Sequence, residues 1–135
     1  MRQHNKKLLV GVAAAAVFLG LIVLTVYLKS VWDYKQAVQE ISIGDVRISD
    51  VADGVYIGEC NVNFIYAKVE VTVQNKEIEK IRILEHKNER GQAAETIVDQ
   101  IVSEQKIDVD AISGATNSSK VIKKAVENAL ENGLQ

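Results

Sequence analysis

Three hydrophobic patterns follow one another along the chain. Leu8–Leu28 is a run of 21 residues without a charged side chain, and about 20 apolar residues suffice for a helix that crosses a bilayer. From about Val51, apolar and polar positions alternate in short segments, which is the period of half-buried strands. The last third repeats pairs of apolar residues at helical spacing. These patterns predict one membrane helix followed by a small α+β domain.

The alternating segments predict three strands joined by short turns. Gly54–Gly58 is a first strand, and Asn61–Asn63 is a turn. Phe64–Gln74 follows, then a tight turn at Asn75–Lys76 and a third strand over Ile78–Leu84. The apolar faces are formed by Ala67, Val69, Val71 and Val73 in the second strand and by Ile81 and Ile83 in the third. Three strands connected in this way form an antiparallel meander.

Two apolar stripes predict two helices in the last third of the sequence. They consist of Ala93, Ala94, Ile97, Val98, Ile101 and Val102 in the first, and of Val121, Ile122, Ala125, Val126, Ala129 and Leu130 in the second. Each stripe lies opposite charged positions, so each helix has one side to bury. The predicted fold is therefore a small antiparallel sheet with two helices packed on one side.

The N-terminal apolar run predicts an uncleaved anchor. A cleaved signal peptide is the alternative, but its apolar region usually has about 7–15 residues and ends at a small-residue site, whereas Lys29–Trp32 follows this run. Arg2, Lys6 and Lys7 precede the run. The positive-inside rule then places the N-terminus in the cytoplasm and the domain outside, in a single-pass membrane protein.

This interpretation divides the chain into three parts. Residues 1–31 form the tail and anchor, residues 32–50 a connector, and residues 51–135 the domain. Two structures remain open for the connector. The membrane helix continues for two or three turns and stops before Gly44, or Ser42–Ile48 forms a short strand.

The predicted outer domain is acidic. All 18 acidic residues but only 12 of the 16 basic ones follow Val31, which gives this part a formal charge of −6. Nucleic-acid binding demands clustered Lys and Arg, so no nucleic-acid partner is expected. No cluster with metal-ligand spacing and no catalytic triad occurs in the sequence. The single cysteine, Cys60, cannot form an internal disulfide. Its strand-like segment favours a small buried side chain, and intermolecular pairing or a reactive thiol is the alternative.

The strongest chemical signal is the stretch Asp110–Thr116. Gly114 can adopt a positive φ and lets a ligand approach the backbone closely, and Thr116 presents a hydroxyl. Asn117 and Ser118 are good N-cap residues for a helix over about Ser119–Glu131. A helix N-terminus after a small-residue loop is a ready anion site. The residues alone therefore predict a phosphate cradle, although many helices open in this way and bind nothing.

The same stretch resembles the D-x-x-[ST]-G-A-T motif of the FMN-binding domain family, through Asp110, Ser113, Gly114, Ala115 and Thr116. Domains of this family carry the covalent FMN of sodium-translocating NADH:quinone reductase and of Rnf-type complexes. Three further segments look like the family's strands, namely residues 53–59, 68–73 and 84–86. The chain departs from the usual family pattern at residues 88–91, where a Thr-Pro often precedes the glycine.

The resemblance implies FMN bound covalently to Thr116 by a phosphoester that a flavin transferase installs. Ser113 and Asp110 would then hold and orient the loop, and Gly114 and Ala115 would leave room for the phosphate. Asn117 or Ser118 would donate hydrogen bonds to the phosphate oxygens. The resemblance also places His86 and Gly91 near the flavin ring. His86 would form a hydrogen bond to the ring or relay a proton; the alternative is an exposed histidine in a loop. Gly91 would let the backbone approach the ring closely; the alternative is that it merely precedes the helix.

These features favour an electron carrier over a stand-alone enzyme. The chain has no G-x-G-x-x-G after a strand and hence no visible NAD(P)H site, while a bound flavin carries its own redox chemistry. The expected partners are a flavin transferase and a redox partner in or outside the membrane. Two alternatives remain: a non-redox assembly module with unmodified Thr116, and a small flavin-dependent reductase.

Overall fold

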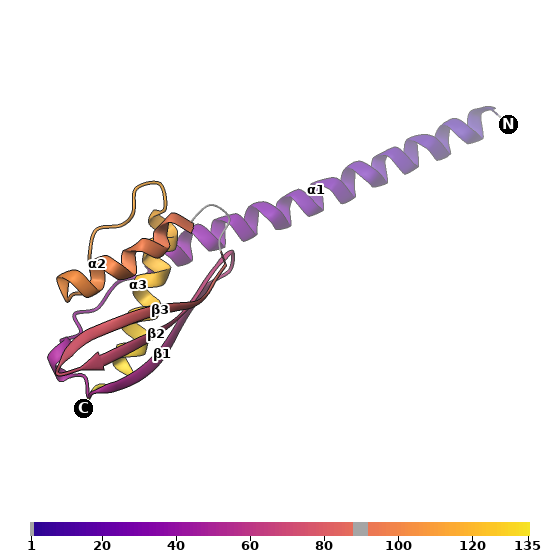
Figure 1. Cartoon of the computed structure of the whole chain (residues 1–135). Helices are drawn as coiled ribbons and strands as arrows, with labels where there is room; N and C mark the ends of the chain where they lie inside the picture. Colours follow the sequence, from indigo (N-terminus) through magenta and orange to yellow (C-terminus); the bar gives the residue numbers. More distant parts are fainter. Residues whose placement is uncertain (1, 88–91) are drawn as a thin grey trace. The chain divides into compact units, whose positions relative to one another are not determined.

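The computed structural model describes residues 2–87 and 92–135. Its elements, in chain order, are α1 (Arg2–Glu40), the 3-10 helix η1 (Ile48–Asp50), β1 (Gly54–Val62), β2 (Ile65–Gln74), β3 (Glu77–Lys87), the 3-10 helix η2 (Gln92–Thr96), α2 (Ile97–Glu104) and α3 (Thr116–Glu131). The chain forms two compact units, Met1–Lys35 and Gln36–Gln135. The strands, α2 and α3 all belong to the second unit (Figure 1).

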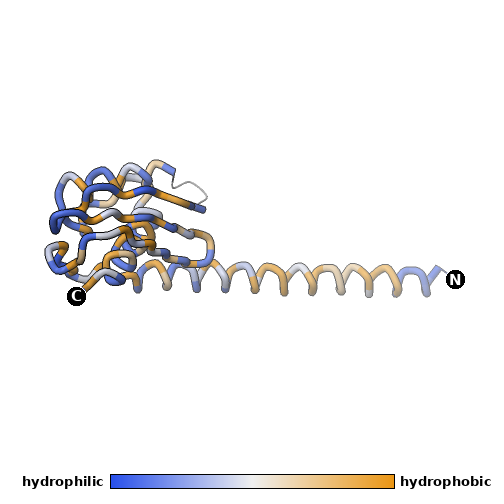
Figure 2. The backbone as a smooth tube through the Cα atoms, turned by 60° about the horizontal axis from the view of Figure 1, so that its bottom comes forward, coloured by the Kyte–Doolittle hydropathy of each residue, from blue (hydrophilic) through white to orange (hydrophobic). Residues whose placement is uncertain are grey.

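The first unit consists of residues 2–35 of α1, a segment that is apolar over most of its length (Figure 2). Its apolar side chains are exposed, and the helix is long and apolar enough to cross a membrane. A signal sequence near an N-terminus meets the same criterion. The helix ends at Glu40, before Gly44, and residues 41–47 form neither helix nor strand. Of the two structures considered for the connector, the continued helix is therefore correct.

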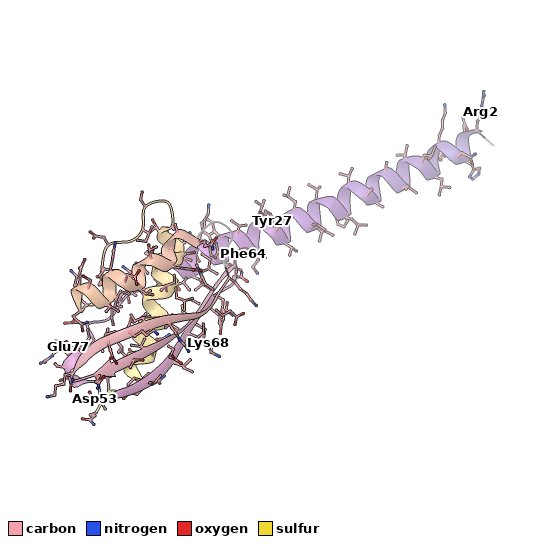
Figure 3. The ribbon with its side chains drawn as sticks, in the orientation of Figure 1. Arg2, Tyr27, Asp53, Phe64, Lys68 and Glu77 are labelled. Carbon is pink, nitrogen blue, oxygen red and sulfur yellow. The ribbon has the colours of Figure 1, made fainter. Side chains whose placement is uncertain are left out.

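The sheet has the strand order β1-β2-β3, and both pairs are antiparallel. Asn75 and Lys76 join β2 to β3 with φ of 54° and 64°, as a type I′ hairpin turn requires. The first hairpin differs from the prediction. Its turn is Asn63–Phe64, and β1 continues through Val62, because Asn63 adopts the positive φ of 66° that closes a two-residue loop. Figure 3 shows Phe64 at this end of the sheet and Asp53 and Glu77 at the other.

Both helices of the domain cover one face of the sheet. α3 packs on β1 and β2, and α2 packs on β3. Between these layers lie fully buried side chains, among them Val69, Val71, Ile97, Ile101, Val121, Ile122 and Leu130. The alternation predicted for β2 is confirmed, since Ala67, Val69, Val71 and Val73 are at most 1% exposed. The predicted fold class, an antiparallel meander with two helices on one side, is also confirmed.

Side-chain amides bond to the backbone of the two edge strands. On β3, Gln105 Oε1 accepts the N–H of Ile78 and Nε2 donates to its carbonyl, both at 2.8 Å. On β1, Asn132 Nδ2 donates to the carbonyl of Ile57 at 3.2 Å, and Asn128 Nδ2 to that of Glu59 at 2.9 Å. Backbone groups of an edge strand are a template for unwanted pairing, and these amides occupy such groups.

Candidate functional site

The loop before α3 ends in a tight turn. The N–H of Ala115 donates to the carbonyl of Ile112 at 2.9 Å, and Gly114 has a φ of 79°. A positive φ at the third position is the signature of a type II turn and favours glycine there. A Cβ at Gly114 would meet nothing within 4 Å. The turn therefore needs glycine for its backbone, and the space beside that glycine is open.

Ser119 ties this turn to the helix. Its side chain is fully buried; Oγ accepts the N–H of Ile112 at 3.0 Å and donates to the carbonyl of Ala115 at 2.7 Å. One hydroxyl thus holds both ends of the turn, which fixes the geometry of the residues between them. The sequence does not single out Ser119, because a serine in the first turns of a helix gives no sign that it reaches back to the loop.

The helix starts earlier than predicted. α3 begins at Thr116 with Ala115 as its N-cap, and no described side chain caps it. The prediction that Asn117 and Ser118 cap a helix starting near Ser119 is therefore wrong, because the Gly114 turn already aligns the chain at Thr116. Thr116 and Asn117 are exposed in the first turn, whereas Ser118 is only 2% exposed.

The loop upstream of the turn is fixed by a buried lysine of α3. Lys123 is 6% exposed, and its Nζ lies 3.0 Å from Asp108 Oδ1 and 2.9 Å from the carbonyl of Val109. The exposed Asp110 follows directly. A buried ammonium without partners would be costly, so this lysine holds the loop down where the stretch Asp110–Thr116 begins. Asp110, Ser113 and Gly114 remain exposed, and Ala115 is buried.

A β-bulge near the end of β3 turns His86 toward the helices. Val69 pairs with Ile83, but Lys68 pairs with Glu85, so Leu84 is an extra residue. Such a slip moves the following side chains to the opposite face. His86 consequently pairs with Ala67 on the buried face, and its side chain is 1% exposed. The alternative of an exposed loop histidine is wrong.

The buried imidazole meets a carboxylate from η2. Nδ1 of His86 lies 3.1 Å from Oε1 of Glu95, whose side chain is 41% exposed. Both residues lie next to the segment 88–91, which is outside the described residues; the prediction for Gly91 falls there. The contact therefore links the end of β3 to the start of the helical part of the domain.

The direction of α3 brings its first turn to the same end of the sheet. Asn132 bonds to Ile57, and Asn128, one turn earlier in the helix, bonds to Glu59, which is later in the strand. α3 and β1 therefore run in opposite directions, and the first turn of α3 lies toward the end of β1 at Val62. This is the end at which β3 finishes, and α3 also contacts η2 (Figure 1). Thr116, His86 and Glu95 thus belong to one end of the domain.

Cys60 occupies the same cross-strand row as His86, with Ala67 between them. The thiol is half-buried, and this burial raises its pKa, while the ammonium of Lys124 lowers it in part. A raised pKa leaves less thiolate at neutral pH. Of the two roles open for Cys60, this setting favours the unreactive, packed side chain.

Comparison with protein families identifies residues 66–131 as an FMN-binding domain. Residues 66–131 thus match the class of FMN-binding domains, and the resemblance stated from the sequence is confirmed for this segment. The matched segment contains β2, β3, α2 and α3, including Thr116 and His86. No curated protein matches the chain.

The residues at the start of α3 fit the phosphate end of FMN. An exposed hydroxyl at Thr116 stands in the first turn of a 16-residue helix without a described side-chain cap, where the N-terminal dipole favours an anion. The open space beside Gly114 leaves room for an approaching group. The exposed Thr116 and Asn117 are therefore accessible to a phosphate, and the buried Ser119 holds the turn before them through Ile112 and Ala115.

Proposed function

We propose that this protein is a membrane-anchored, extracytoplasmic electron carrier whose FMN is joined to Thr116 by a phosphoester. The observation that carries the proposal is the position of Thr116, exposed in the first turn of α3, within a segment that matches the FMN-binding domain. A fold maintained for packing alone has no need of an accessible hydroxyl at this point.

The attachment joins the phosphorus of the FMN phosphate to Oγ of Thr116, with overall loss of one water. The dipole of α3 favours the phosphoester charge. Of the two predicted donors to its oxygens, the exposed Asn117 is the candidate, because Ser118 is only 2% exposed. Gly114 admits the phosphate beside the backbone, Ser113 and Asp110 orient the loop, and a flavin transferase recognises the loop during maturation.

The anchor sets where electrons are delivered. With Arg2, Lys6 and Lys7 on the cytoplasmic side, α1 holds the domain at the outer surface of a cell membrane, near a redox partner in the membrane or beyond it. Restricting the domain to the surface raises its effective concentration for that partner. A covalent bond also retains FMN where it would otherwise be lost by dilution.

Bound FMN supplies the electron-accepting and electron-donating chemistry, while the protein supplies attachment, orientation and electrostatics. Within the chain, His86 is the candidate to hydrogen-bond the flavin ring, because its buried imidazole lies at the same end of the domain as Thr116. Gly91 is proposed to let the backbone approach the ring.

The attachment is tested with Thr116→Ala and Thr116→Ser, each produced together with a flavin transferase. Thr116→Ala lacks the nucleophilic oxygen, so we expect no flavin fluorescence on its band after denaturing electrophoresis, with an unchanged circular dichroism spectrum. Thr116→Ser keeps a hydroxyl and is the matched control; we expect it to retain part of the covalent flavin. Fluorescence on the Thr116→Ala band would assign the bond to another residue.

Electron carriage is tested on the flavin-loaded full chain in detergent. A carrier exchanges electrons with a one-electron or two-electron mediator in a reversible titration and turns over no soluble substrate by itself. Reversible titration without turnover supports the carrier. Steady turnover of a small oxidant or reductant would instead make the protein a reductase, and absence of flavin would make it an assembly module.

A further inference from the structure

The contact between Glu95 and His86 carries an inference that the sequence did not suggest. Glu95 stands in η2, nine positions after His86 in β3, and the two meet only because the Leu84 bulge turns His86 inward. Without the bulge, Glu85 would face the helices and the imidazole would lie on the outer face of the sheet, on the side of Lys68, since side chains alternate along a strand.

The two side chains have different surroundings. The imidazole of His86 is 1% exposed, whereas the carboxylate of Glu95 is 41% exposed and remains in contact with water. A hydrated carboxylate is an acceptor only. At 3.1 Å from Nδ1, it therefore favours a proton on that nitrogen. In a neutral imidazole, Nε2 then carries the lone pair.

We infer that Glu95 is a positioning residue, which fixes His86 in the Nδ1–H tautomer so that Nε2 is the acceptor at the flavin end of the domain. This inference rests on the proposed function for the role of the flavin, and on the Nδ1–Oε1 contact for the tautomer. It adds Glu95 to the site, and it makes His86 an acceptor from the flavin rather than a donor to it.

The tautomer is measured without flavin. Nitrogen-15 spectra of the full chain, labelled at histidine, contain only His4 and His86, and His86→Asn identifies the second. We expect Nδ1 of His86 to be protonated and Nε2 to be bare in the neutral ring. We expect Glu95→Ala to lower the Nδ1–H fraction strongly. Glu95→Gln keeps an acceptor oxygen at the same place in the side chain and should therefore retain part of the Nδ1–H fraction.

Glu85→Ala is the matched control. Glu85 is a carboxylate next to His86 in sequence, but it contacts Lys87 at 3.4 Å and lies on the outer face. Its loss should leave the tautomer unchanged. An Nε2–H tautomer in the unaltered protein, or an Nδ1–H fraction that Glu95→Ala does not change, would overturn the inference.

The action on the flavin is measured by a double-mutant cycle of midpoint potentials at neutral pH. His86→Ala and Glu95→Ala should each shift the potential and leave the attachment to Thr116 intact. Because Glu95 acts through His86, the double variant should shift it no further than His86→Ala alone. Additive shifts would contradict a positioning role. If the unaltered protein carries no flavin, the proposed function fails, while the tautomer measurement still decides the Glu95–His86 pairing.

Discussion

The C-terminal half of α3 and the first turn of the same helix have different surroundings. In the C-terminal half, the helix backbone lies directly on β1, where Gly58 leaves no room for a Cβ, because Ala125 O and Ala129 N would lie 2.1 and 2.3 Å from it. In the first turn, Thr116 and Asn117 are exposed and no described side chain caps the helix. The C-terminal half is fixed to the sheet, whereas the first turn presents two exposed polar side chains.

Under the proposed function, the difference explains how a small domain presents an attachment residue at its surface. The fixed half and the buried Lys123 and Ser119 determine where Thr116 lies. The first turn of α3 therefore does not depend on packing of the Thr116 and Asn117 side chains. We therefore expect substitutions in the fixed half to affect stability, and substitutions in the first turn to affect flavin attachment.

Gly58→Ala should disrupt the contact between the C-terminal half of α3 and β1, and it should have the largest effect on stability. The added methyl overlaps backbone atoms that cannot rotate away, so α3 must move off β1. We expect a loss of about 3 kcal/mol, the upper range for overpacking, or a fall of roughly 15 °C in the unfolding temperature. Thermal circular dichroism of the full chain measures it. An unchanged unfolding temperature would show that α3 is not seated on Gly58.

Gly114→Ala is the complementary substitution in the turn that precedes α3. Space is available for the methyl, but the φ of 79° costs an L-residue about 1–2 kcal/mol. The turn before Thr116 should therefore rearrange while the sheet stays intact. We expect a smaller fall in unfolding temperature than for Gly58→Ala and a lower yield of covalent flavin. Full loading of Gly114→Ala with FMN would show that attachment does not depend on the geometry of this turn.

Asn128→Ala and Asn132→Ala test how the C-terminal half of α3 is attached to β1. Each removes one hydrogen bond to an edge carbonyl of β1, which is worth about 1 kcal/mol. The double variant should also associate more readily, because the edge becomes available for pairing. Sedimentation velocity compares it with the unaltered chain. A monomeric double variant of unchanged stability would show that these amides do not protect the edge.

The reactivity of Cys60 gives the smallest effect. Because burial raises the thiol pKa, less thiolate is present at a given pH, and iodoacetamide should alkylate Cys60 more slowly than a free thiol. Lys124→Ala removes the charge that lowers this pKa and should slow the reaction further. Faster alkylation in Lys124→Ala would mean that the lysine shields the thiol sterically.

Much of the fold could be predicted from the sequence, because burial on one face imposes a period. The alternation around Val69 and Val71 predicted β2 and its buried face, and the stripes with Ile97 and Ile122 predicted both helices. The bulge at Leu84 could not be predicted. An apolar residue there fits either face, and only pairing with β2 reveals the slip that turns His86 inward.

The residue types of the candidate site could be predicted from the sequence, but the residues that hold it in place could not. The stretch around Gly114 and Thr116 stands out by its residue types. Ser119, Lys123 and Glu95 are polar residues of ordinary appearance, and their roles depend on contacts with residues 7, 14 and 9 positions away, which form only on folding. The helix start was misplaced for the same reason, since the turn at Gly114 replaces a side-chain cap.

The most direct test of the central claim is the intact mass of the full chain, produced with a flavin transferase and measured after denaturation. The account predicts a gain of one FMN less one water, carried by the peptide that contains Thr116, with flavin fluorescence on the same band. An unmodified mass from a protein that folds normally would contradict covalent attachment at Thr116.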